Sequence, residues 1–229
     1  MRRIGRLTLV LVLLLLAACG TPETVDPAKV ASEGAVAFDA VSAFHFKLVV
    51  SDGDAAPLND IILVEADGDT ARPDKLKAKL KAKLPGVPIL SNNNVIIIGA
   101  DAWVTANPFD PDTYTKQADT AGLAAFSPAK GVSDVLRGLR GAAYVAQEEI
   151  GGVQTHHLSG TVDAVTLAAL TGGAATAGEV KLDLWIGVED KLVRQVIAVG
   201  ALDPSEKPAI KRTLTLSEFN KTVEIAPPQ

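Results

Sequence analysis

The chain has 229 residues, of which 48% are hydrophobic, 21% charged and 4% aromatic, and its formal net charge at pH 7 is −5. This composition excludes a disordered chain and suits one globular domain with an aliphatic core. The negative charge and the scarcity of aromatic rings argue against a nucleic-acid partner, and a single cysteine excludes a disulfide framework or a cysteine-rich metal centre.

The N-terminus carries the pattern of a bacterial export signal. Three arginines at positions 2, 3 and 6 precede an apolar run from 7 to 16, which is shorter than the roughly 20 residues that span a bilayer. The run ends in Leu-Ala-Ala-Cys, which resembles a lipobox. The resemblance implies that Cys19 becomes the first mature residue and carries two acyl chains, which hold the protein on the outer face of the cell membrane, outside the cytoplasm. The alternative is a soluble secreted protein with an incidental cysteine.

This signal divides the chain into three parts. Residues 1–18 form the signal peptide, 19–26 the lipidated N-terminus and linker, and 27–229 a single domain.

Asp26 and Pro27 are typical of a helix N-cap and first helical position, and they predict a helix over 27–43. The apolar period then changes to two, which predicts half-buried strands over 44–50 and 58–66.

The segment 75–84 reads Lys-Leu-Lys-Ala-Lys-Leu-Lys-Ala-Lys-Leu. These residue types favour a helix, but a helix would spread the lysines around its whole circumference. A strand places every lysine on one face and every Leu or Ala on the other. We therefore predict a strand, with a solvated lysine-rich helix as the alternative.

The remaining elements follow in short succession. Strands are expected over 94–99 and 102–106, a loop over 107–111, and a helix over 128–139 after the Ser127-Pro128 cap signal. Further strands are expected over 144–150, 153–162, 180–188, 192–201, 210–219 and 222–225, with a short helix over 164–170. About ten strands with mostly hairpin-length connections and three helices predict an antiparallel α+β domain.

No catalytic, cofactor or metal-binding constellation emerges, so we predict no enzyme activity, no cofactor and no metal site. Ser133 lies in a sequence that resembles a nucleophile elbow but lacks its final glycine, and it falls in a predicted helix. His156 and His157 are neighbours in a predicted strand and point to opposite faces, so they do not share a metal ion. A hydrolase built on these residues is therefore the least favoured hypothesis for the function.

Several stretches resemble the LppX/LprAFG-type lipoproteins, which are best known from mycobacteria. They are Gly-Val-Gln-Thr-His-His-Leu-Ser-Gly at 152–160, Leu-Trp-Ile at 184–186, and Leu-Thr-Leu-Ser-Glu-Phe at 214–219. The resemblance implies a curved antiparallel half-barrel with helices over its concave face, similar to the Lol-type carriers, and an apolar cavity between sheet and helices. It also implies that an acylated lipid or glycolipid binds there for transfer across the cell envelope, and a membrane transporter is an expected partner.

The walls of such a cavity are expected on the inward faces of the strands. The predicted wall and lid residues are Val36, Phe46, Leu48, Val50, Leu76, Leu80, Ile96, Ile98, Leu136, Leu139, Leu182, Leu184, Leu214 and Leu216. A register error of one residue would move every side chain of a strand to the other face. The same aliphatic residues also suit a packed core, so a non-carrier lipoprotein with a solid core, acting as a structural or interaction module, is the alternative.

Overall fold

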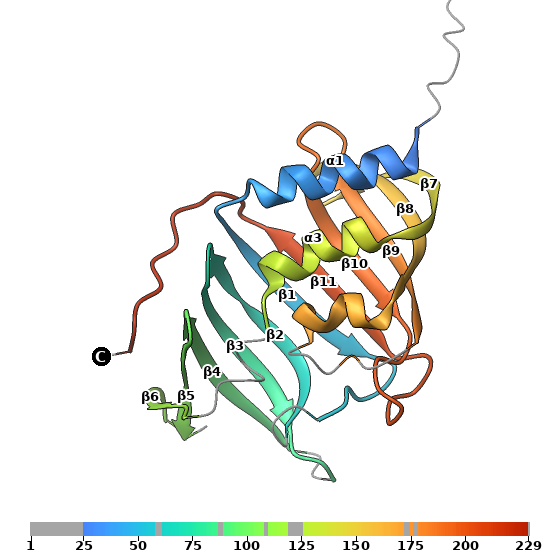
Figure 1. The fold of residues 1–229 in the computed structure, drawn as a ribbon. Coiled ribbons are helices and arrows are strands. Elements are labelled where there is room, and N and C mark those ends of the chain that lie inside the picture. The colour runs from blue at the N-terminus through green and yellow to red at the C-terminus, as the bar shows by residue number, and fades with distance from the viewer. Residues whose placement is uncertain are drawn as a thin grey trace, which may run out of the picture.

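The computed structural model describes residues 25–57, 61–86, 89–107, 110–118, 126–171, 175 and 178–228. The predicted signal peptide and Cys19 lie outside these residues. Eleven strands form one antiparallel sheet in the order β6-β5-β4-β3-β2-β1-β11-β10-β9-β8-β7 (Figure 1). Every neighbouring pair is antiparallel, as the short connections predicted.

The sheet divides into two halves on either side of β1. The strands are β1 (Ala43–Ser51), β2 (Ile62–Ala71), β3 (Lys75–Lys83), β4 (Leu90–Ile98), β5 (Asp101–Asn107), β6 (Asp110–Lys116), β7 (Arg140–Ile150), β8 (Val153–Asp163), β9 (Glu179–Gly187), β10 (Val193–Val199) and β11 (Lys211–Ser217). The helices are α1 (Pro27–Asp39), α3 (Pro128–Gly138) and the 3-10 helix η1 (Ala164–Leu170). All three lie over the half made by β7–β11, whereas the described residues place no helix over β2–β6 (Figure 1).

The lysine-rich segment is strand β3, which confirms the prediction. Its lysines are mostly exposed and alternate with Leu76, Ala78, Leu80 and Ala82, which face the inner side. On the outer side Glu65 of β2 lies 3.2 Å from both Lys47 and Lys81, so neighbouring strands alternate in charge. Alternation along the strand thus separates an ionic outer face from an apolar inner face.

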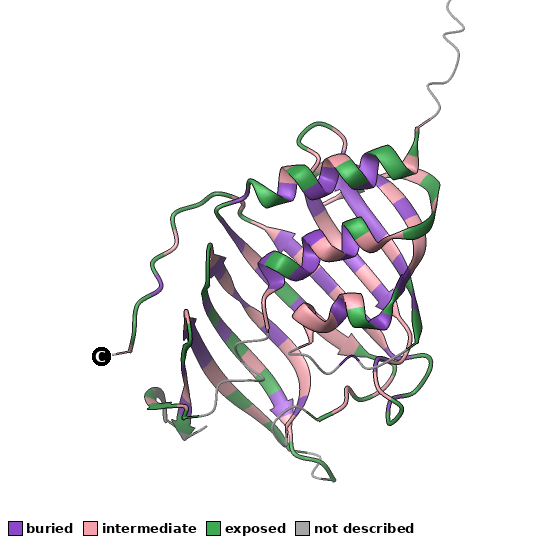
Figure 2. Ribbon diagram, viewed as in Figure 1, coloured by how far each residue is buried: buried purple, intermediate pink, exposed green. Residues whose placement is uncertain are grey.

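The inner face forms one continuous apolar row across seven strands. Register pairs Leu80 with Ala66, Ala66 with Leu48, and Leu48 with Leu214, and the row then continues through Val196, Leu184 and Leu158. The members beneath the helices are buried (Figure 2). In β2, a Cβ on Gly68 would lie 2.2 Å from the carbonyl oxygen of Lys77, so only glycine allows this close approach of β2 and β3.

Helix α1 starts where predicted but ends four residues early. Asp26 accepts hydrogen bonds from the backbone N–H groups of Ala28 (3.0 Å) and Lys29 (3.2 Å). At the other end Arg72 donates to the carbonyls of Phe38 (3.2 Å) and Val41 (2.8 Å). Its guanidinium also reaches the carbonyl of Ala129 in α3 (2.9 Å). A side chain from the turn after β2 therefore satisfies carbonyls at and just beyond the C-terminal end of α1.

Several other boundaries differ from the prediction. Strand β2 ends at Ala71 and not at 66, and β4 begins at Leu90 and not at 94. Residues 110–116, predicted partly as loop, form β6, because pairing along the edge of β5 overrides their turn-type composition. Residues 222–225 form no strand, and β7 begins at Arg140, directly after α3. Ser127 precedes α3 as predicted but makes no side-chain capping hydrogen bond.

Candidate functional site

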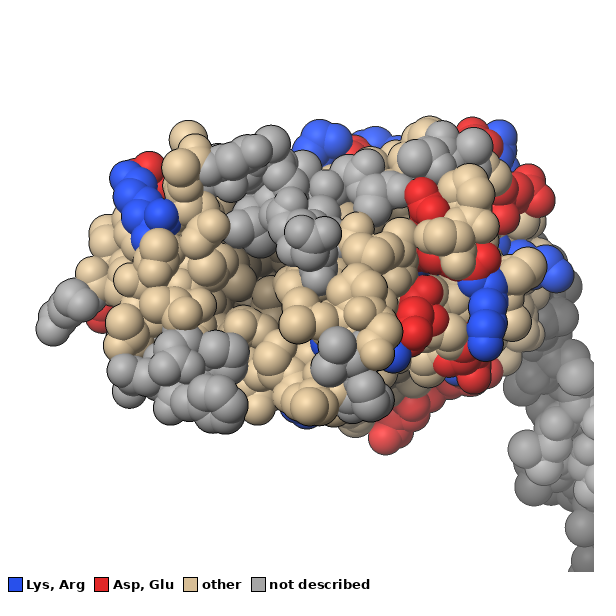
Figure 3. Space-filling view, turned by 90° about the horizontal axis from the view of Figure 1, so that it is seen from below, with Lys and Arg blue, Asp and Glu red and all other residues tan. Residues whose placement is uncertain are grey.

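An open cavity lies on the inner face of the half-sheet that carries no helix. Its cavity volume is about 250 Å³, and about 1070 Å³ when the open solvent at its mouth is included. It is lined by Ile61, Leu63, Ala66, Leu76, Ala78, Leu80, Asn93, Val95, Ile97, Val104, Thr105, Gln117 and Phe126. The end of the molecule seen in Figure 3 is hollowed, and the described atoms that border the hollow are uncharged.

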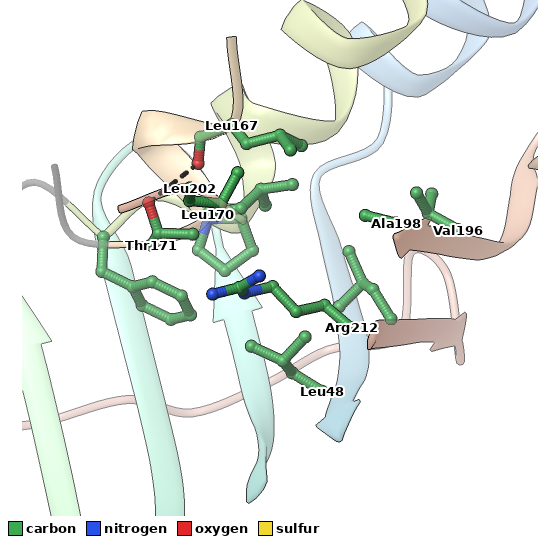
Figure 4. A pocket seen from close by; sticks show the side chains of 11 residues that line it. Leu48, Leu167, Leu170, Thr171, Val196, Ala198, Leu202 and Arg212 are labelled. Carbon is green, nitrogen blue, oxygen red and sulfur yellow. Dashed lines mark hydrogen bonds between the residues drawn. The ribbon is translucent and has the colours of Figure 1, made fainter. Parts of the chain in front are cut away.

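Two smaller pockets that share lining residues with this cavity lie beneath the helices. The covered pocket, with a cavity volume of only about 30 Å³, lies between the sheet and η1 and is lined by Leu48, Phe126, Pro128, Leu167, Leu170, Thr171, Val196, Ala198, Leu202, Arg212 and Leu214 (Figure 4). The bridging pocket, with a cavity volume of about 60 Å³, is lined by Leu48, Val50, Ala55, Ala56, Leu63, Phe126, Leu170, Thr171, Leu202, Glu206 and Arg212. It shares Leu63 with the open cavity and Arg212 with the covered pocket, so the three spaces adjoin.

Phe126 stands where these spaces meet. It lines the open cavity, the covered pocket and the bridging pocket, and its ring lies 6.0 Å from that of Phe46, centroid to centroid. Phe126 is only partly buried, whereas Phe46 is fully buried in the core. The Phe126 residue therefore contributes to the lining of all three spaces.

A single ion pair interrupts the apolar lining. Arg212 of β11 pairs with Glu206, and their side chains are 9% and 2% exposed. Glu206 also accepts hydrogen bonds from the backbone N–H groups of Ala56 and Leu202, each at 2.8 Å. Burial lowers the pKa of Arg212, and the neighbouring carboxylate of Glu206 acts against that shift. A guanidinium remains charged in proteins, so the pocket contains a neutralised but strongly polar pair.

The structure distributes the predicted wall residues over several environments. Leu76 and Leu80 line the open cavity, while Leu48, Val50 and Leu214 line the covered or bridging pockets. The remaining inward residues are packed beneath the helices: Phe46, Leu136, Leu182, Leu184 and Leu216 are buried, and Leu139 is partly buried against the same core.

Three of the predicted residues are wrong. Val36 is 68% exposed, because α1 turns Ala35 and Phe38 toward the sheet instead. Ile96 and Ile98 pair with Lys77 and Lys75, so they share the outer face with those lysines. In β4 the cavity is lined by Val95 and Ile97. The run 95–98 is apolar throughout, so its own pattern contains no signal for the face.

Four other residues of the lining, Ala78, Val104, Arg212 and Glu206, are not among the predicted wall residues. Ala78 and Val104 alternate correctly with their neighbours, and their strand pattern contained the signal that places them in the lining. Arg212 reads as an ordinary strand residue between Lys211 and Thr213. Glu206 lies in a loop, and only the fold brings it to β11.

Ser133 has a structural environment. It is 3% exposed, and its hydroxyl donates to Asp39 of α1 at 2.7 Å. Arg137 also pairs with Asp39, so the two helices are joined by a buried hydroxyl and an ion pair. The hydrogen bond from Ser133 is the main cause that lowers the pKa of Asp39, with Arg137 contributing. A hydroxyl that donates to a carboxylate at a helix contact holds α1 against α3.

The adjacent histidines occupy separate environments. His157 lies between Asp183 (2.8 Å) and Glu148 (3.2 Å), and its ring stacks on Trp185 at 4.2 Å. His156 is 9% exposed, packs edge-on against Tyr144, and its Nδ1 has no hydrogen-bond partner within the described ranges. Burial, with a smaller effect from Lys191, lowers the pKa of His156.

Neutral burial of His156 predicts an acid-sensitive fold. The unfolded chain regains the ordinary histidine pKa of about 6.5, so between that value and the lower folded pKa only the unfolded state takes up the proton. Stability contributed by neutral His156 is therefore full above pH 6.5 and falls as the pH drops below it. We expect the melting temperature to fall less between pH 7.5 and 5.5 in His156→Leu than in the wild type. His45→Gln, on the outer face, is the control; equal falls in all three proteins would contradict the prediction.

Within the described ranges, no helix is both long and apolar enough to cross a bilayer. In sequence, lipoprotein LprA of Mycobacterium tuberculosis (strain ATCC 25618 / H37Rv) is 26% identical over 219 residues, which cover 91% of this chain and 84% of that protein. Residues 26–225 match the LppX_LprAFG lipoprotein family, which is nearly the whole of the predicted domain.

Two solved structures share the fold. The crystal structure of LprF from Mycobacterium bovis matches with a TM-score of 0.69 and 16% identity, over 88% of this chain and 96% of that one. The crystal structure of LppX from Mycobacterium tuberculosis matches with a TM-score of 0.61 and 17% identity, over 88% of this chain and all of that one. The predicted half-barrel is thereby confirmed. By its sequence match over residues 26–225 and by this shared fold, the chain belongs to the LppX_LprAFG lipoprotein family.

Proposed function

We propose that this protein is a membrane-tethered, extracytoplasmic carrier that binds acylated lipids or glycolipids and helps to transfer them across the cell envelope. The observation that carries the proposal is the open cavity of about 250 Å³, which has a largely apolar lining and shares lining residues with the two pockets under the helices. The family provides the setting, since it is a family of lipoproteins. The empty space argues against the alternative of a solid-core interaction module.

The energetics explain what such a cavity contributes. A sixteen-carbon chain exposed to water costs on the order of 12 kcal/mol, at about 0.8 kcal/mol per methylene. An apolar wall that covers the chain again removes most of this barrier. Transfer then needs only comparable affinities in the two membranes, and no covalent step.

The proposal includes the anchor at Cys19. Two acyl chains on this residue would hold the domain at the outer face of the cell membrane. The mature chain, which loses three arginines from a net charge of −5, carries −8 and has no attraction to anionic lipids. A membrane transporter that loads or unloads the domain is the partner that such a carrier would use. Mass spectrometry of the mature N-terminus tests the anchor, and an unmodified Cys19 would remove it from the proposal.

Lipid extraction tests the carrier function directly. The whole chain with Cys19→Ser, which has no acyl chains of its own, is purified and extracted with organic solvent. We expect at least one acylated lipid in the extract and saturable uptake of added dipalmitoylglycerol. A lipid-free extract together with no uptake would refute the proposal and favour the solid-core module.

Phe126→Ala is expected to merge the three spaces. Removing the ring leaves the open cavity, the bridging pocket and the covered pocket in one space, so longer acyl chains fit. We expect mass spectra of bound lipid to shift toward longer chains, and the variant to be less stable by about 3–5 kcal/mol at most, since the ring is only partly buried. Phe219→Ala, a second partly buried ring that lies away from these pockets, is the control. An unchanged chain-length profile in Phe126→Ala would contradict the prediction.

A further inference from the structure

Arg212 is the only cationic side chain that lines the open cavity, the covered pocket or the bridging pocket within the described residues. Its guanidinium points into the space between Leu48 and the leucines at 170 and 202 (Figure 4). Its side chain is 9% exposed. The lysines of β3, in contrast, lie on the outer face of the sheet. Burying a charged group in so apolar a lining costs free energy unless other protein groups compensate its charge and its hydrogen bonds fully.

The compensation by the protein is partial. A guanidinium has five N–H groups in a rigid plane. Among the described residues, Arg212 donates to Glu206 and, at a long 3.4 Å, to the carbonyl of Gly200. Glu206 is held by the backbone N–H groups of Ala56 and Leu202, so the carboxylate is fixed on the side of the loop. Three of the five N–H groups therefore have no acceptor among the described residues, and the side chain that carries them lines the covered and bridging pockets.

The charge balance selects the kind of acceptor that fits there. Arg212 and Glu206 together carry no net charge, so an anion in the pocket would add an uncompensated negative charge to an apolar site. A neutral acceptor adds none. The ester carbonyl of an acyl lipid is such an acceptor, and it enters the pocket together with the apolar chain to which it is attached.

We propose that Arg212 is a polar anchor for bound lipid: it donates a hydrogen bond to an ester carbonyl and so selects ester-linked over ether-linked chains. Glu206 acts through Arg212 as a positioning residue. The inference rests on the proposed carrier function, because it requires acyl chains in the pocket. It goes further by assigning a residue, an atom class on the ligand and a direction of selectivity.

The test compares two lipids that differ only in the carbonyls. The whole chain with Cys19→Ser is titrated with 1,2-dipalmitoylglycerol and with its ether analogue, 1,2-di-O-hexadecylglycerol. A hydrogen bond to a charged donor predicts that the ester binds at least about tenfold more tightly. Arg212→Lys keeps the charge beside Glu206 but loses the planar fork, and we expect the ratio to approach one while ether binding stays unchanged.

Each outcome separates the anchor from the carrier function. If neither lipid binds, the carrier function fails. If the wild type binds both equally, or Arg212→Lys keeps the preference, the anchor is refuted and the carrier stands.

Arg194→Lys is the matched control, because Arg194 is 12% exposed and paired with Asp190 but lines none of these pockets. Should Arg212→Lys fail to fold, the neutral double variant Arg212→Met/Glu206→Gln is read in the same way. If the anionic lipid dipalmitoyl phosphatidate binds far more tightly than dipalmitoylglycerol, the proposal that Arg212 binds a neutral acceptor is refuted.

Discussion

Leu80→Trp is expected to lower the affinity for dipalmitoylglycerol by more than about a hundredfold. Leu80 is half-buried on β3 and faces the open cavity, so an indole at this position occupies space that acyl chains would fill. Each methylene excluded from the cavity costs about 0.8 kcal/mol, and four excluded methylenes already correspond to a factor above one hundred. The same variant should co-purify with little or no lipid in the extraction experiment.

The control is a tryptophan one residue away. Lys79 precedes Leu80 on the same strand but is exposed on the outer face, so Lys79→Trp adds the same ring outside the cavity. We expect Lys79→Trp to bind lipid like the wild type, with circular dichroism and melting temperature measured for both variants. Equal binding by Leu80→Trp and the wild type would show that the ligand does not use the open cavity.

We expect Glu206→Ala to lower the free energy of unfolding more than any other single substitution of a residue that lines these pockets. Removing one partner of a buried ion pair leaves the other charge without compensation and typically costs about 3–5 kcal/mol. Here it also leaves the backbone N–H groups of Ala56 and Leu202 without their acceptor. For a chain of this size the loss corresponds to a fall of about 6–20 °C in melting temperature.

An exposed ion pair provides the comparison. Lys130 and Asp134 pair at i,i+4 on α3, and the Lys130 side chain is 69% exposed. Lys130→Gln should therefore change the free energy of unfolding by no more than about 0.5 kcal/mol. Urea denaturation of the wild type and both variants makes the measurement. A loss below about 1 kcal/mol in Glu206→Ala would mean that water reaches the Arg212 guanidinium.

The buried ion pair and the open cavity both lower the stability that the fold could otherwise have. A hydrophobic pair of similar volume would make a more stable core, because buried ion pairs seldom repay their desolvation. An open cavity likewise forgoes the packing that a filled core would have. Both departures lie on the inner face of the sheet, the cavity over β2 to β5 and the ion pair at β11. Such a concentration of unfavourable features is what a binding site requires.

Local patterns in the sequence were sufficient for most elements. Strand β3 follows from strict alternation over 75–83, and the start of α1 follows from Asp26 and Pro27. The antiparallel arrangement follows from connections too short for a crossover. The family resemblance, carried by stretches such as 152–160, led to the half-barrel that the shared fold confirms. In each case the information lies within a few neighbouring residues.

Only the tertiary structure decided which side chains meet the cavity. The face of β4 depends on its pairing with the lysines of β3, because Val95 to Ile98 are all apolar. Glu206 reaches Arg212 only when the loop before β11 folds back, and Phe126 reaches three pockets only when α3 is placed on the sheet. Secondary structure is determined by short-range periodicity, which a sequence displays. A cavity is the space left between distant segments, and that depends on contacts that no local pattern records.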